Sequence, residues 1–150
     1  MKKTSQILTL LFIACAWSGA RAANDAQQTF AGYEIVYSAF NSSFISPEVA
    51  ATYHIIRGKD RGLVNIAVLK RGADVNIGGK PALVTGYVSN ILGQRQQLAF
   101  VEVNEGTATY YLAPFRFQNE DFMTFKIRVQ QDPDKPADEL SFQRTFYRDR

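Results

Sequence analysis

Apolar and polar residues alternate along much of this chain. In the clearest case, residues 123–129, single polar residues separate four apolar ones, Met123, Phe125, Ile127 and Val129. A period of two is typical of a β-strand with one buried face. Residues 140–146 repeat the pattern, but Arg144 interrupts the apolar face and predicts a bulge or the margin of a sheet.

Further strands are predicted wherever short apolar runs lie between turn-forming residues. They are residues 33–40, 63–70, 82–92, 98–103 and 107–113, with a glycine-rich turn at 75–80 and a hairpin connection at 104–106. Pro114 predicts that residues 115–117 form an edge or a bent continuation. About seven strands at short spacing favour an all-β fold, an immunoglobulin-like two-sheet β-sandwich, with a small closed barrel as the alternative.

The connection between the first two long strands has a different pattern. Within YSAFNSSFISPEVAATYHI, Ser46 is a favoured helix N-cap and Pro47 suits the first helical position. Helical spacing places three apolar residues on one face, Val49, Tyr53 and Ile56. The connection is therefore predicted to hold one short helix, ended at Gly58, whose apolar face caps an open end of the sandwich.

The N-terminus has the three-part pattern of a secretory signal. Lys2 and Lys3 precede an apolar run at 7–17, and small residues flank Arg21 before the expected cleavage after Ala22. We therefore expect a cleaved signal peptide at residues 1–22, a flexible leader at 23–29 and a single β domain at 30–150. The expected location is the periplasm, with no membrane span; the alternative is a lipoprotein anchored through Cys15.

The signal also accounts for the net charge of the chain. The whole sequence has 17 Lys and Arg against 14 Asp and Glu, a net charge of +3. Residues 1–22 hold three basic residues and no acidic one, which leaves 17 − 3 = 14 basic against 14 acidic residues beyond Ala22. The net charge of the exported domain is therefore no evidence for nucleic acid or anionic lipid as a partner.

Few residues of the exported chain could carry chemistry. His54 is the only histidine and Cys15 the only cysteine, which leaves no ligand set for zinc and no thiol beyond the signal. We expect no cofactor, no metal and no enzymatic activity. Two alternatives are a small-ligand binding protein and a small hydrolase-like enzyme that uses one of four paired acids, Glu102, Glu105, Glu120 and Asp121. A further alternative is a calcium site built from Asp132, Asp134, Asp138 and Glu139.

A non-enzymatic binding or structural module is the favoured function, with an envelope protein or polymer as its partner. The helical connection and the loop after it are the predicted contact region, comprising Asn41, Glu48, Tyr53, His54, Arg57, Lys59 and Arg61. A basic run fits an acidic partner or an anionic polymer, or is an ordinary charged rim; it consists of Arg57, Lys59, Arg61, Lys70 and Arg71.

Three stretches of the sequence are similar to one protein family. YEIVYSAFNSSFISPEVAATYHIIRGKDRGLVNIAVLKRG, YYLAPFRFQNED and SFQRTFY resemble the bacterial envelope family called domain of unknown function 4426. The likeness runs from about Phe30 to Tyr147. It implies a secreted immunoglobulin-like β domain, and it implies no activity, cofactor or catalytic residue.

Overall fold

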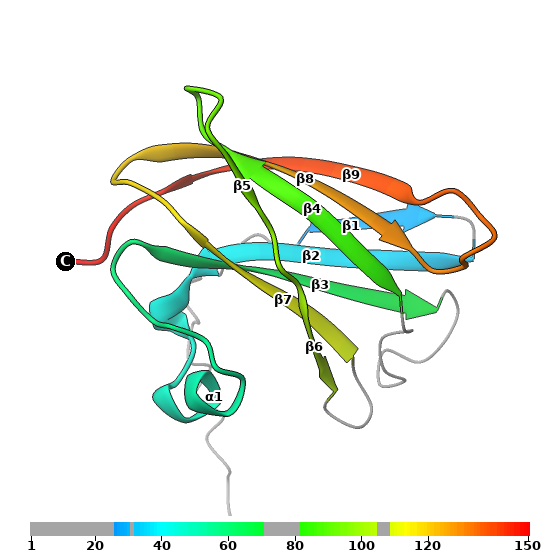
Figure 1. The fold of residues 1–150 in the computed structure, drawn as a ribbon, viewed down its shortest axis with the longest axis horizontal. Helices are drawn as coiled ribbons and strands as arrows, with labels where there is room; N and C mark the ends of the chain where they lie inside the picture. Colours follow the sequence, from blue (N-terminus) through cyan, green and yellow to red (C-terminus); the bar gives the residue numbers. More distant parts are fainter. Residues whose placement is uncertain (1–25, 31, 71–81, 105–108) are drawn as a thin grey trace, which may run out of the picture.

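Two antiparallel sheets form the body of the protein (Figure 1). The computed structural model describes residues 26–30, 32–70, 82–104 and 109–150. In chain order the strands are β1 (Ala26–Phe30), β2 (Tyr33–Asn41), β3 (Arg61–Lys70), β4 (Leu83–Ser89), β5 (Arg95–Gln97), β6 (Val101–Asn104), β7 (Thr109–Arg116), β8 (Asp121–Gln130) and β9 (Asp138–Phe146). The sheet orders are β1-β2-β3-β7-β6 and β5-β4-β8-β9. The predicted two-sheet all-β fold is confirmed, and the described residues do not form the alternative closed barrel.

The core lies between the inner faces of the two sheets. The alternating apolar residues of β8 are all buried, as their spacing predicts, and they meet the inner face of β3, formed by Val64, Ile66 and Val68. Phe115 of β7 packs edge-on against two rings of the other sheet, with centroids 5.1 Å from Phe125 and 5.0 Å from Phe146. Such aromatic pairs add specific contacts to the burial of apolar area.

The first strand was not predicted. Residues 26–29, assigned to a flexible leader from the sequence, pair with β2 in a register that runs from Ala26 opposite Tyr37 to Phe30 opposite Tyr33. Gln27, Gln28 and Thr29 are exposed because β1 is the edge of its sheet. Three consecutive exposed polar residues give no alternation to detect. The ring of Phe30, stacked 5.5 Å from Tyr33, packs against the core.

The predicted strand at 98–103 begins where the chain crosses from one sheet to the other. The chain pairs with β4 through Arg95–Gln97, leaves that sheet, and pairs with β7 through Val101–Asn104. The side-chain amide of Gln96 secures the crossing, because it donates to the carbonyl of Arg116 at 2.7 Å and accepts from the amide of Arg116 at 2.8 Å. The predicted strand at 98–103 therefore merges a crossing segment with the start of β6.

Two interruptions of the strand pattern have different outcomes. Phe115 continues β7 beyond Pro114 and pairs only with β3, because β6 begins at Val101, opposite Leu112, so the predicted edge is correct. Arg144 causes no bulge, since β8 and β9 pair without a gap. It lies at the sheet margin, as predicted, on the edge strand β9, and its guanidinium donates to the carbonyl of Ala39 in the other sheet.

Several predictions fall on residues that the structure does not describe. These are the signal at 1–22 with Cys15, the glycine-rich turn at 75–80 and most of the hairpin connection at 104–106. Among the residues that are described, no helix is both long and apolar enough to cross a membrane.

Candidate functional site

The connection between β2 and β3 is a folded segment with two short helices, η1 (Ser42–Phe44) and α1 (Pro47–Thr52). Ser46 caps α1 as predicted, because its hydroxyl oxygen accepts the amide of Val49 at 3.3 Å, and Pro47 is the first helical residue. The helix ends at Thr52, with Tyr53 as its C-cap, rather than at the predicted Gly58. His54 has a φ of 55°, and this left-handed turn closes the helix.

The turn at His54 has the hydrogen bonds of a Schellman motif. The amide of Ile55 donates to the carbonyl of Ala50 at 2.8 Å, and the amide of His54 donates to the carbonyl of Ala51 at 3.4 Å. A residue other than glycine at this position carries backbone strain. The chain reverses here, which brings residues 53–55 down onto the sheet.

The connection covers a sheet face and not the open end of the sandwich. Tyr53 and Ile55 lie over the outer face of the five-stranded sheet, against Leu63, Leu112 and Val103. The predicted burial of Val49 is wrong, because its side chain is 41% exposed, while that of Ala50 is only 4% exposed. With six residues, α1 is too short to present a full apolar stripe, and the single small residue Ala50 makes its inward contact.

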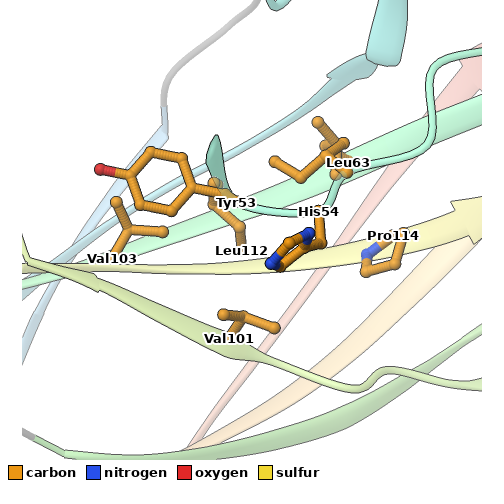
Figure 2. A pocket seen from close by; sticks show the side chains of 8 residues that line it. Tyr53, His54, Leu63, Val101, Val103, Leu112 and Pro114 are labelled. Atoms are coloured by element: carbon orange, nitrogen blue, oxygen red, sulfur yellow. The ribbon is translucent and has the colours of Figure 1, made fainter. Parts of the chain in front are cut away.

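An apolar pocket lies between the connection and this sheet face. It has a volume of about 60 Å³ and is lined by Tyr53, His54, Ile55, Leu63, Val101, Val103, Leu112 and Pro114. Figure 2 shows the rings of Tyr53 and His54, from the connection, facing side chains of β6 and β7. Apart from the Tyr53 hydroxyl and the His54 imidazole, the lining side chains are hydrocarbon, so the pocket suits an aliphatic group.

The base of the connection is closed by one buried serine. The hydroxyl of Ser42, a residue with no exposed surface, donates to the carbonyl of Gly58 at 3.2 Å and accepts the amide of Gly58 at 3.0 Å. Arg57, which the sequence placed in the contact region, donates to the carbonyl of Ser43 at 3.1 Å beside this closure.

The other predicted contact residues lie outside the pocket. Asn41 holds the C-terminal tail, since its amide donates to the carbonyl of Tyr147 and to the carboxylate of Asp149, both at 2.9 Å. The Ser43 hydroxyl, then the Asn41 amide and the charge of Lys59, hold the pKa of Asp149 below its usual value. The predicted contact region therefore separates into a pocket part, Tyr53 and His54, and a part that docks the tail.

Two further members of the predicted contact region, Glu48 and Arg61, do not line the pocket. Glu48 is exposed, and its own backbone amide, followed by the Ser46 hydroxyl, holds the pKa of its carboxyl below the usual value. Arg61 is half-buried at the start of β3. Lys70 is at the opposite end of this ten-residue strand, so the predicted basic run does not form one patch.

The candidate catalytic acids do not converge. Glu102 and Glu120 are exposed, and the carboxylate of Asp121 accepts the amide of Gln118 at 2.9 Å within a turn. Glu105 lies outside the described residues. None of the three described acids lines the apolar pocket.

Three of the four candidate calcium ligands contact other groups of the protein. Asp132 pairs with Lys135 at 3.4 Å, Glu139 pairs with Arg128 at 3.3 Å, and Asp138 accepts the hydroxyl of Tyr33. In the part of the chain that the structure describes, no three His, Cys, Asp or Glu side chains are grouped so as to hold a metal ion.

Comparison with known proteins identifies relatives of this chain. The sequence matches the family Domain of unknown function (DUF4426) over residues 27–149. The crystal structure of a DUF4426 family protein from Pseudomonas aeruginosa PAO1 is 30% identical in sequence, with a TM-score of 0.72 over 83% of this chain and 96% of that chain. No curated protein matches the sequence.

More distant structures share the fold. FetP from a uropathogenic E. coli strain, isolated after expression in the periplasm, is 10% identical and has a TM-score of 0.54 over 83% of this chain and 95% of that chain. A copper-bound FetP variant, also 10% identical, has a TM-score of 0.58 over 84% and 97%. At such identity the likeness concerns the fold alone.

Proposed function

The match over residues 27–149 makes this chain a member of the DUF4426 family, and we propose that it is a non-enzymatic binding module of the bacterial cell envelope. Its ligand is an extended segment of a partner polypeptide, which places an aliphatic side chain in the pocket beneath the helical connection. The pocket of about 60 Å³ carries this proposal.

The size of the pocket favours a side chain over a free small molecule. Pockets that enclose small molecules have volumes of roughly 300–1,000 Å³ and several convergent polar groups. This pocket is far smaller and its sheet side is formed by Leu63, Val101, Val103, Leu112 and Pro114. It can accept one aliphatic group, whose burial contributes about 1.5–3 kcal/mol.

The neighbouring strand offers the rest of the binding site. β6 is the last strand of its sheet, and no described element pairs with its outer edge. A partner segment that adds a strand there gains main-chain hydrogen bonds and places alternate side chains on the face of Val101 and Val103. Val101 is 50% exposed at the rim of the pocket, so the entrance is open from this edge.

The placement of the acids supports the non-enzymatic part of the proposal. An enzyme requires acids or bases that converge on a concave site. Glu102 and Glu120 are exposed and do not line the pocket, and Asp121 is half-buried beside a different hollow that neither of them lines. The signal at residues 1–22 and the periplasmic expression of the structural neighbour FetP support an envelope location. Copper binding belongs to the FetP variant and is not part of this proposal.

Site-specific photo-cross-linking tests the proposal. Because the sequence has no cysteine beyond Cys15, Val101→Cys can carry a benzophenone at the rim of the pocket in the exported protein. Thr85→Cys, an exposed position on the other sheet, is the matched control. In living cells we expect a discrete protein adduct from position 101 and none from position 85.

A variant that fills the pocket completes the test. Leu112→Phe adds volume to the pocket lining without a polar group, so it should preserve folding and abolish the adduct from position 101. Equal adducts from both positions, adducts that contain only polysaccharide, or an adduct unaffected by Leu112→Phe would each contradict a polypeptide-binding pocket.

A further inference from the structure

The hairpin between β4 and β5 carries two adjacent aliphatic residues that face solvent. Ile91 is 76% exposed and Leu92 is 77% exposed, and no other neighbouring pair of large apolar residues in the described part of the chain is exposed in this way. Single exposed apolar residues are ordinary on protein surfaces, whereas contiguous apolar surface is typical of contact sites. Figure 1 shows the hairpin projecting beyond the sandwich.

The exposure is built into an ordered turn. The side-chain oxygen of Asn90 accepts the amides of Leu92 at 3.1 Å and Gln94 at 3.0 Å, while its nitrogen donates to the side chain of Gln94 at 2.7 Å. Gly93 adopts a φ of 77°, and its amide donates to the carbonyl of Asn90 at 3.0 Å. The two aliphatic side chains are thus held at the tip before any partner binds, which reduces the entropy lost on binding.

Three arginines surround the base of the same hairpin. Arg95 follows the turn directly, and its guanidinium lies 4.7 Å from the ring centroid of Tyr87. Arg116 and Arg148 line a hollow of about 290 Å³ together with Asn90 and Gln94. Within the described residues none of these guanidinium groups has a carboxylate partner.

The acidic groups of this surface do not cancel the three positive charges. Asp60 and Asp121 line the same hollow, and the carboxylate of Asp121 accepts the amide of Gln118. Within the hollow, Arg116 and Arg148 equal Asp60 and Asp121 in number, so Arg95, which lies over Tyr87 and outside the hollow, supplies the one positive charge in excess. The exported domain as a whole is formally neutral, so the attraction for anions comes from this local arrangement.

We propose that the hairpin end binds the surface of an anionic phospholipid bilayer. Ile91 and Leu92 enter below the headgroups, and the arginines contact the headgroup phosphates from the base of the hairpin. The shape distinguishes a bilayer from a protein partner, because a projecting tip enters lipid without a complementary cavity, whereas a protein must supply one. Apolar burial combined with attraction to anionic lipid is the general basis of peripheral membrane binding.

Vesicle co-sedimentation of the exported domain tests the hairpin. The probes are vesicles of phosphatidylethanolamine with phosphatidylglycerol and vesicles of phosphatidylcholine alone. The double variant Ile91→Ser with Leu92→Ser should weaken binding by about 100-fold, since burial of each aliphatic side chain is worth roughly a factor of ten or more. The matched control is Val49→Ser with Ile56→Ser, exposed aliphatic residues on the connection, which should leave binding unchanged.

A second set of variants tests the charge. The triple variant Arg95→Gln, Arg116→Gln and Arg148→Gln should remove the preference for phosphatidylglycerol vesicles, while Lys135→Gln, on the distant β8–β9 loop, should retain it. Leu112→Phe, which fills the pocket, should also retain the preference for phosphatidylglycerol vesicles. Failure of lipid binding by the hairpin is therefore distinguishable from failure of polypeptide binding by the pocket. Absence of vesicle binding, or equal losses in the test and control variants with unfolding midpoints unchanged, would overturn the proposal.

Discussion

The side chain of Ser42 bonds both backbone groups of Gly58. Its hydroxyl accepts the Gly58 amide at 3.0 Å and donates to the Gly58 carbonyl at 3.2 Å, across 16 positions of sequence. A backbone segment that lies between two strands must satisfy its polar groups without a neighbouring strand. One buried hydroxyl therefore determines where the connection returns to the sheet, and with it the position of Tyr53 and His54 over the pocket.

Replacing Ser42 by alanine should destabilise the protein by about 2 kcal/mol. The substitution leaves the partly buried amide of Gly58 without its partner, whereas the Gly58 carbonyl keeps the amide of Arg61 at 3.2 Å. An unsatisfied buried group carries a penalty of about 1–3 kcal/mol. Urea unfolding measures the effect. Ser141→Ala, at an exposed position of β9, is the control and should change stability by less than about 0.5 kcal/mol. A Ser42→Ala protein as stable as the control would show that water replaces the hydroxyl.

The sequence predicted strands well where one face is buried and the other is exposed. In β8, buried residues alternate strictly with more exposed ones, and the pattern gave the strand within a few residues of its bounds. β1 escaped detection because Gln27, Gln28 and Thr29 are all exposed. The division between β5 and β6 escaped because apolar residues continue through the crossing, where Leu98 still packs in the core. The spacing of apolar residues shows which positions are buried, but it does not show to which sheet a strand belongs.

Replacing His54 by glycine should stabilise the protein by about 0.5–1 kcal/mol. His54 has a φ of 55° at the end of α1, and a left-handed residue other than glycine carries about 1–2 kcal/mol of strain. The greater freedom of glycine in the unfolded chain offsets about 0.4–1 kcal/mol of the gain. Chemical denaturation would detect the difference, and His54→Ala should give no such gain. A glycine variant less stable than the parent would show that packing of the imidazole outweighs the strain.

Replacing Gly62 by alanine should cost about 3 kcal/mol, near the upper end for inserting a methyl group into a packed core. Gly62 pairs with Phe115, and a Cβ atom there would lie 2.2 Å from Cζ of the Phe115 ring. The ring cannot retreat freely, because Phe125 and Phe146 contact it edge-on. The double variant Gly62→Ala with Phe115→Leu should lose less stability than the sum of the single variants. If the stability losses of the two single variants add strictly, the backbone, and not the Phe115 ring, moves to make room for the methyl group.

The sequence predicted two of the eight residues that line the candidate site. Tyr53 and His54 were predicted as contacts, and both line the pocket. Its floor was not predicted, because a strand pattern does not show what covers the outer face of a sheet. One signal existed, since β3 is apolar on both faces: Leu63 is buried on the outer face beside Val64 on the inner one. A strand buried on both sides indicates a covering element, and here that element is the connection.

The two sheets are joined by a hydrogen bond whose pH dependence can be measured. Tyr33 of β2, 6% exposed, donates its hydroxyl proton to the carboxylate of Asp138 at the start of β9. Burial raises the pKa of Tyr33 above its usual value, and the hydrogen bond to Asp138 and its negative charge raise it further. Burial also raises the pKa of Tyr111.

A raised pKa in the folded state means that the native protein retains a proton that the unfolded chain releases. The stability that Tyr33 contributes is therefore fully present below about pH 10, the pKa of unfolded tyrosine, and declines as the pH rises above it. One such group gives a slope of up to about 1.4 kcal/mol per pH unit. In urea unfolding series above pH 10, the stability of Tyr33→Phe should decline less steeply with pH than that of the parent. The slope for Asp138→Asn should fall between the two, because burial still raises the pKa of the Tyr33 phenol in that variant. The residual slope in Tyr33→Phe is assigned to Tyr111 and the other alkaline groups. If Tyr33→Phe declined as steeply as the parent, the hydroxyl of Tyr33 would not be the buried proton that links the sheets.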